Sequence, residues 1–187
     1  MKKNSKWIIV AVLAIVACVY CISAYNSLVR QEQEVETAWA NVETQYQRRA
    51  DLIPNLVATV KGYAKHEQET LSQVVEASAN ALGGAANVEE YAEAQQQVTA
   101  ALGRLIAIAE SYPALKADAS FLELQAQLEG TENRITVSRS EYNEQVKSYN
   151  TAIVTFPSNL IAGMFGFEKK PLFKASEGAS QAPQVQF

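Results

Sequence analysis

The sequence holds few of the residues that catalytic and metal sites require. It contains two cysteines and one histidine, and both cysteines, Cys18 and Cys21, lie near the N-terminus. The rest of the chain therefore offers no disulfide framework, thiolate nucleophile or cysteine-based metal site. GxSxG, HExxH and phosphate-loop motifs are absent, and His66 would need metal ligands from other helices, so we expect it to be a solvated histidine on a helix face. The sequence predicts no enzyme, no metal and no cofactor.

Glycine, proline and net charge are also low. The 187 residues include eight Gly and five Pro, whereas Ala, Gln and Glu are plentiful, as in helical proteins. The net charge of −4 is mild and the basic residues are scattered, so the chain has no electrostatic footprint for nucleic acid.

Residues 1–25 form a segment of their own. Lys2, Lys3 and Lys6 precede an uncharged apolar run over residues 7–25, a length that matches the ~20 residues of a transmembrane helix. The next twenty or so residues hold one arginine and several glutamates. The positive-inside rule therefore predicts a single-pass protein with a cytoplasmic N-terminus and the remaining chain outside.

Two other interpretations compete for this segment. A cleaved signal peptide would have a shorter apolar core and a small-residue cleavage site, for which SAY at 23–25 is poor. Residues 15–18, IVAC, resemble a lipoprotein lipobox, in which Cys18 would be lipidated after cleavage. Because the apolar run continues past Cys18, we predict an uncleaved anchor and keep Cys18 as a candidate lipidation site.

Beyond the anchor, apolar residues recur every three or four positions, which predicts amphipathic helices and an all-α class. We expect an up-and-down four-helix bundle over residues 26–157, with a turn near residues 50–54, a glycine turn at Gly83 and Gly84, a helix over about 88–111 and a last helix from Asp118. Asp51 would cap the second helix with Pro54 in its first turn, and a kinked continuous helix is the alternative.

Residues 158–170 combine an apolar cluster with a lysine pair. These side chains either lie in the lipid interface or cover the open end of the bundle: Leu160, Ile161, Met164, Phe165 and Phe167. Residues 171–187 are rich in Ser, Gly, Ala and Gln, which predicts a flexible tail.

Charged residues near the predicted helix seams form a candidate polar network: Arg48, Arg49, Asp51, Asp118, Glu132, Asn133 and Arg139. Charges on a seam must pair or lose several kcal/mol of solvation. We therefore expect Arg48 or Arg49 to pair with Asp51, Asp118 or Glu132, either to fix helix register or to form a ligand or partner site. Tyr142 and Tyr149, seven residues apart, are expected in the core.

Several motifs in order resemble the LemA family of bacterial membrane proteins: YNSLV at 25–29, AW at 38–39, QRRADLIPNLV at 47–57, VKGYAKHE at 60–67, YPALKA at 112–117, TEN at 131–133, YNEQVKSYN at 142–150, FP at 156–157 and GF at 166–167. The resemblance implies an N-terminal membrane anchor followed by a closed four-helix bundle, and it implies no particular chemistry.

Together these features predict a non-catalytic scaffold or interaction module at the bacterial inner membrane, with its bundle extracytoplasmic. Its expected partners are the lipid bilayer, further copies of itself as a homo-oligomer, and unidentified membrane or extracytoplasmic proteins. The alternative is an extracytoplasmic sensor or ligand-binding domain that signals through its transmembrane helix, with Arg48 and Arg49 receiving an anion.

Overall fold

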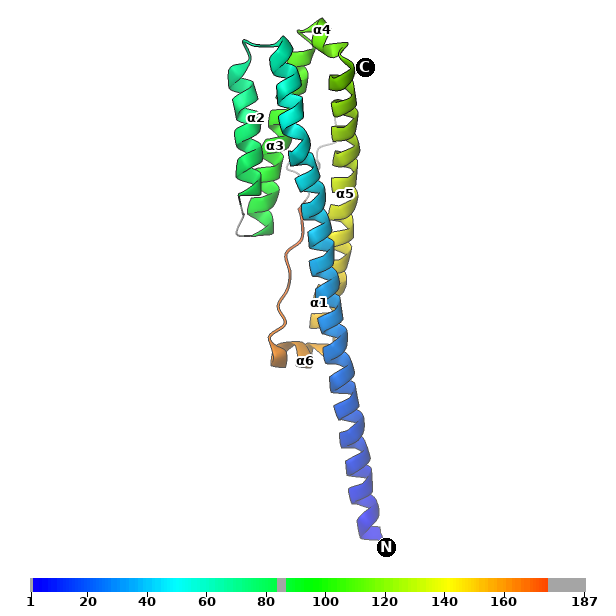
Figure 1. Cartoon of the computed structure of the whole chain (residues 1–187). Helices are drawn as coiled ribbons and strands as arrows, with labels where there is room; N and C mark the ends of the chain where they lie inside the picture. The colour runs from blue at the N-terminus through cyan, green and yellow to red at the C-terminus, as the bar shows by residue number, and fades with distance from the viewer. Residues whose placement is uncertain (1, 84–86, 175–187) are drawn as a thin grey trace, which may run out of the picture. The chain divides into compact units, whose positions relative to one another are not determined.

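A computed structural model describes residues 2–83 and 87–174, with side chains from Trp7 onward, and every regular element in these ranges is a helix. The predicted all-α class and the long apolar N-terminal helix are confirmed. The helices, drawn in Figure 1, are α1 (Lys2–Tyr63), α2 (Gln68–Leu82), α3 (Val88–Ala109), α4 (Pro113–Lys116), α5 (Ala119–Val154) and α6 (Ser158–Phe165).

The chain divides into two compact units. Unit 1 comprises Met1–Ala40 and Glu141–Pro171, and unit 2 comprises Asn41–Ser140 and Leu172–Phe187, of which the structure describes residues 172–174 at the C-terminal end. Helices α1 and α5 therefore each contribute to both units. This division differs from the single bundle predicted over residues 26–157.

Four helical segments share the core of unit 2, namely the C-terminal part of α1, α2, α3 and the N-terminal part of α5 (Figure 1). Their buried apolar side chains form one cluster that includes Ile53, Leu56, Val60, Leu71, Val74, Val98, Leu102, Leu105, Phe121 and Leu128. Each such side chain contributes about 1.5–3 kcal/mol on burial, so this cluster is the main source of stability in the unit. The detailed up-and-down arrangement predicted from the sequence is not confirmed.

The predicted turn at residues 50–54 is wrong, because α1 continues through Pro54 to Tyr63. Tyr46, Ile53 and Val60 are all buried, so the apolar seam keeps its phase across the proline, which itself is exposed. Proline removes one helical hydrogen bond, and on the solvent side water can replace that bond. Asp51 does not cap a helix; it accepts a hydrogen bond from Gln47 Nε2 at 2.8 Å.

The first break in the helical chain instead lies at residues 64–67. The Ala64 amide still bonds the Val60 carbonyl at 2.8 Å, and the Glu67 amide then closes a tight turn onto Ala64 at 3.1 Å. At the start of α5, the Phe121 amide donates to Asp118 Oδ1 at 2.9 Å. The predicted role of Asp118 as the cap of the last helix is therefore confirmed. Helix α2 ends at Leu82, before Gly83 as predicted, whereas Gly84 lies outside the described residues.

Unit 1 packs residues of α1, α5 and α6 around a small apolar core. Its buried side chains are Leu28, Val35, Ala38, Tyr142, Val146, Tyr149, Ile153, Ile161 and Ala162. Tyr142 and Tyr149 are thus core residues, as predicted, and the ring of Trp39 lies 5.5 Å from that of Tyr142.

The segment after α6 contributes residues to both units. In unit 1, Asn150 Nδ2 donates to the Lys170 carbonyl at 2.8 Å and Asn150 Oδ1 accepts from the Lys170 amide at 2.9 Å. In unit 2, Phe173 is buried, with the Arg139 guanidinium carbon 4.7 Å from its ring centre. Residues 171–174, assigned to the tail from the sequence, therefore belong to the folded protein. The rest of the predicted tail, 175–187, lies outside the described residues.

Candidate functional site

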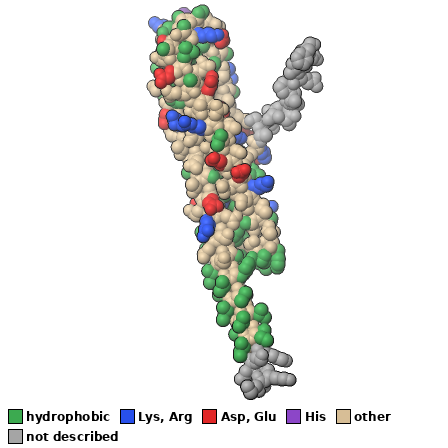
Figure 2. Space-filling model, turned by 90° about the vertical axis from the view of Figure 1, so that its right-hand side faces the viewer, with side chains coloured by type: hydrophobic (Ala, Val, Ile, Leu, Met, Phe, Trp, Pro, Cys, Tyr) green, Lys and Arg blue, Asp and Glu red, His purple; other side chains and the backbone are tan. Residues whose placement is uncertain are grey.

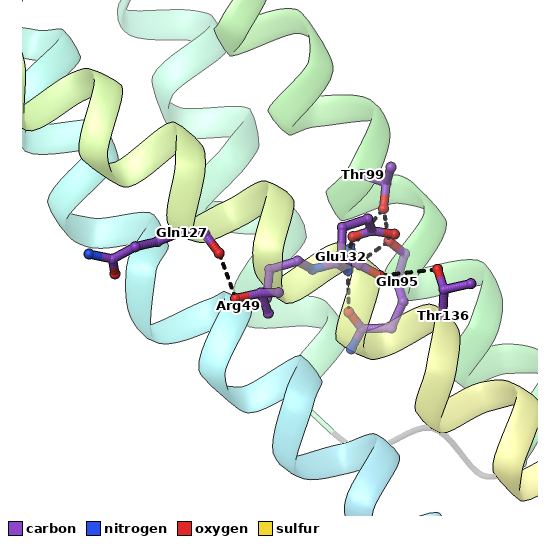
Figure 3. Close-up of polar contacts among 7 residues, drawn as sticks. Arg49, Gln95, Thr99, Gln127, Glu132 and Thr136 are labelled. Atoms are coloured by element: carbon purple, nitrogen blue, oxygen red, sulfur yellow. Dashed lines mark hydrogen bonds and ion pairs between the residues drawn. The ribbon is translucent and has the colours of Figure 1, made fainter.

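Arg49 is the largest polar side chain buried in unit 2, with 2% of its surface exposed. It lies on the buried face of α1 and extends toward α3 and α5 (Figure 3). Nη1 donates to Thr99 Oγ1 and to Glu132 Oε2, both at 2.9 Å. Nη2 donates to the carbonyl oxygen of Gln95 at 3.0 Å and to its Oε1 at 2.6 Å.

These contacts use every hydrogen on the two terminal nitrogens of Arg49. The guanidinium carbon also lies 5.1 Å from the centre of the Tyr46 ring, a cation–π distance. The small space beside Arg49 is bordered by Ser78, Leu82 and Gln95 and has no room for a water molecule. An anion at this point would have to displace an existing partner, so the arrangement fits a structural contact better than a receptor site.

The structure brings Arg49 together with Glu132 and leaves other members of the predicted network elsewhere. Arg48 and Asn133 are exposed. Asp118 lies at the start of α5, where Tyr63 Oη donates to its Oδ2 at 2.8 Å. These hydrogen bonds from the Phe121 amide and the Tyr63 hydroxyl lower the pKa of Asp118 below its usual value.

Arg139 interacts with Tyr46, beside Arg49, and also contacts the C-terminal segment of unit 2. Its Nη2 donates to the Lys174 carbonyl at 3.2 Å, and its guanidinium lies over the Phe173 ring. Lys174 in turn forms an ion pair with Glu89 of α3. Arg139 therefore holds residues 173 and 174 against the helices.

Sequence reasoning missed Gln95, Thr99 and Tyr46 as partners of Arg49. A signal for Gln95 was present, since it falls between Tyr91 and Val98 at the spacing of the α3 seam, where an apolar residue is the norm. Gln95 is 4% exposed. Burial raises the pKa of Tyr91 to about 12 and raises that of Tyr46, so both phenols stay neutral beside the arginine.

No group of three or more His, Cys, Asp or Glu side chains that could hold a metal ion occurs in the described part of the chain. His66 is exposed in the turn between α1 and α2.

The candidate membrane-spanning stretch belongs to unit 1. Helix α1 is long and apolar enough to cross a membrane, with a window of mean hydropathy 2.7 near the N-terminus and no residue of that window buried. Cys18 and Cys21 are exposed on this stretch, and lipidation of Cys18 stays a prediction. Figure 2 shows hydrophobic side chains gathered along it.

The apolar cluster predicted in residues 158–170 is split by the structure. Ile161 is buried with Ala162, whereas Leu160, Met164 and Phe165 are exposed and Phe167 is half-buried. One face of α6 therefore covers the core of unit 1, and the other face is open.

Comparison with known proteins agrees with the resemblance seen in the motifs. A model of the LemA family matches residues 38–187. Protein LemA of Metamycoplasma hominis is 26% identical over 152 residues, which cover 81% of this chain and 69% of that protein. Magnetosome protein MamQ of Magnetospirillum gryphiswaldense is 27% identical over 191 residues, covering 88% and 70%. Magnetosome protein MamQ 1 of Paramagnetospirillum magneticum is 26% identical over 192 residues, covering 89% and 71%.

None of these names describes a catalysed reaction. The family match and the apolar N-terminal helix together make this a membrane-associated helical protein. The match extends from the part of α1 that follows the apolar run through every later helix. The chain belongs to the LemA family.

Proposed function

We propose that the protein is a membrane-anchored scaffold that performs no chemistry and acts through contacts with copies of itself, with other membrane or extracytoplasmic proteins and with lipid. One observation carries the proposal. Arg49 is the feature of the sequence that most resembles a binding site, and all of its terminal donors bond to Gln95, Thr99 and Glu132. The Arg49 cluster therefore joins three helices and offers no terminal donor to a ligand. We infer that the protein acts through contacts made by its surface.

The surfaces of α3 and α5 support self-association. Exposed side chains there include the neutral residues Gln96, Gln97, Leu122, Gln127 and Val137. Interface centres are depleted in charged side chains, because burying an unpaired charge costs several kcal/mol. Glutamine amides and apolar side chains can be buried against a second copy without that cost.

The charge pattern around the apolar run supports the orientation. Lys2, Lys3 and Lys6 precede it, and the residues just after it carry an excess of glutamate over arginine. The N-terminus is then cytoplasmic and both Glu132 and Arg49 lie outside the inner membrane.

A crosslinking experiment tests the scaffold. A photoreactive amino acid would replace Gln127, on the exposed face of α5, in full-length protein kept in native membranes. Buried Ala101 provides the matched control position. We expect products of twice the chain mass, joined between differently tagged copies, from position 127 and not from 101. The proposal would be overturned if every exposed position tried gave only uncrosslinked single chains and the pure protein turned over a substrate.

A separate experiment tests the orientation. Protease added to intact spheroplasts should cleave the chain beyond α1's apolar run. Cleavage only after the inner membrane is permeabilised would reverse the orientation and leave the scaffold proposal in place.

A further inference from the structure

Helix α6 has two faces of different character. Ile161 and Ala162 are 5% and 2% exposed and pack into unit 1. On the open face, Leu160 and Met164, four residues apart, are 61% and 75% exposed, and Phe156, in the turn that precedes α6, is 75% exposed. No residue of α6 is charged. We call Phe156, Leu160, Met164 and Phe165, all exposed, the ridge; water-soluble surfaces rarely leave such groups of large apolar side chains uncovered.

The ridge lies at the end of the membrane-crossing run. Tyr25, the last residue of that run, has its ring centre 4.7 Å from the ring of Phe165 and 5.8 Å from that of Phe167. The C-terminal end of α6 therefore lies beside the last residue of the apolar run of α1. In Figure 1, α6 lies beside α1 within unit 1 and at a steep angle to its axis, which is the orientation of an interfacial helix next to a helix that crosses a membrane.

Several contacts hold α6 in this position. Gly166 ends the helix in the left-handed region at φ 75°, where a glycine has no steric penalty, and the chain turns back there. Lys170 Nζ then pairs with Glu32 Oε1 of α1 at 2.7 Å, and Asn150 of α5 bonds both backbone groups of Lys170. These contacts therefore hold α6 in place, so that its open face keeps one orientation within unit 1.

We propose that α6 is an interfacial helix whose ridge of Phe156, Leu160, Met164 and Phe165 inserts into the outer leaflet beside the transmembrane helix. The proposal rests on the membrane anchor assumed in the proposed function. Lipid is the occupant that fits, because the ridge continues the apolar surface of α1 at Tyr25, α6 carries no charge, and the exposed Lys169 follows at the height of lipid headgroups.

The expected effect is large enough to measure. Inserting one Leu, Met or Phe side chain into an apolar phase shifts the equilibrium by about tenfold or more. Replacing Phe156 and Leu160 by aspartate removes two such contributions, which should shift the equilibrium between inserted and lifted α6 by roughly a hundredfold or more.

Nitroxide accessibility in the full-length protein tests this. In a Cys18→Ser/Cys21→Ser background, single labels at Met164→Cys, on the ridge, and at Asn159→Cys, exposed on the polar side of α6, form a matched pair. A label at Val12→Cys marks the lipid-embedded anchor. The protein would be reconstituted in vesicles of phosphatidylethanolamine and phosphatidylglycerol, and collision rates with oxygen and with a water-soluble nickel chelate would be compared.

We expect the label at 164 to favour oxygen as the label at 12 does, and the label at 159 to favour the nickel chelate. Adding Phe156→Asp and Leu160→Asp should make position 164 aqueous. Equal access of the chelate to 159 and 164 would overturn the proposal, as would spin–spin broadening at 164, which would identify a second copy as the occupant. A lipid-exposed label at 12 with an aqueous label at 164 rejects the α6 proposal alone, whereas aqueous labels at both reject the anchor.

Discussion

Substitutions of Arg49 test whether its network is structural. Three replacements of Arg49 disturb the network to increasing degrees. Methionine keeps much of the side-chain length without the charge, alanine leaves a cavity, and glutamate reverses the charge. Arg48 is adjacent in sequence and exposed, so Arg48→Met is the matched control for loss of an arginine.

The magnitude follows from what each partner of Arg49 retains. In Arg49→Met the carbonyl of Gln95 still accepts from Thr99 Oγ1 at 3.1 Å, and the Glu132 side chain, 48% exposed, can be hydrated. Gln95 Oε1 loses its donor inside the core, and a buried unsatisfied acceptor costs about 1–3 kcal/mol. We therefore expect Arg49→Met to lower the free energy of unfolding by about 1–3 kcal/mol.

The other two replacements should cost more. Arg49→Ala adds a cavity to the lost hydrogen bonds, for a total of about 3–5 kcal/mol. Arg49→Glu buries a carboxylate against Glu132 and the Gln95 carbonyl. Its cost approaches the whole stability of a typical domain, about 5–15 kcal/mol, so unit 2 should unfold.

A double variant separates the hydrogen-bond loss from the change in volume. In Arg49→Met/Gln95→Met the orphaned acceptor is removed together with its donor, which can be nearly neutral. The double variant should therefore be more stable than Arg49→Met alone, although it carries an additional substitution.

Urea unfolding of the full-length protein in mild detergent, followed by circular dichroism, measures these differences. The Arg48→Met control should stay within about 0.5 kcal/mol of the parent. Arg49 variants that unfold at the same urea concentration as Arg48→Met would refute a structural role. Stabilisation of the parent by phosphate, lost in a folded Arg49→Ala variant, would instead favour the sensor hypothesis.

Three further predictions concern local features. The pKa of Asp118 is lowered in the folded state, so its contribution to stability is present at neutral pH and is lost as the pH falls through that lowered value. Between neutrality and the region below pH 3.8, the thermal midpoint of Asp118→Asn should therefore depend less on pH than that of the parent protein. Parallel curves of thermal midpoint against pH for the two proteins would contradict this. Pro54→Ala should raise the free energy of unfolding by up to about 3 kcal/mol, because α1 continues through this position; a lower urea midpoint would argue against a continuous helix. Asn150→Ala removes two hydrogen bonds to Lys170, about 1–3 kcal/mol together, and hydrogen exchange of the Lys170 amide should accelerate; unchanged protection would show another partner for that amide.

Local patterns in the sequence predicted the features that local forces decide. Apolar spacing predicted the helices, and Asp118 was identified as a cap because its carboxylate bonds an amide three residues away. The turn at Pro54 was inferred from helix lengths, on the assumption that each helix needs a partner of comparable length. In the structure α2 and α3 cover α1 in unit 2, and α5 and α6 pack with it in unit 1, so the long helix requires no turn.

The site shows the same limit. Glu132 could be predicted as an arginine partner because it interrupts an apolar pattern. Gln95 carried a similar signal, because it interrupts the apolar seam of α3. Thr99 carried none, because its contact with Arg49 depends on how α3 packs against α1 and α5. The open face of α6 likewise became visible only in the structure, where Ile161 and Ala162 are buried and Leu160 and Met164 are exposed.

The pairing of Asn150 with Lys170 has a consequence for resistance to aggregation. An extended segment normally offers unpaired amides and carbonyls to which a foreign strand can add, and such edges seed aggregation. Here the carboxamide of Asn150 bonds both backbone groups of Lys170, Pro171 has no amide hydrogen, and its carbonyl accepts from Tyr142 Oη at 2.9 Å. The backbone of Lys170 and Pro171 therefore offers no free hydrogen-bonding group with which a foreign β-strand could pair, although no strand in the described part of the chain covers it.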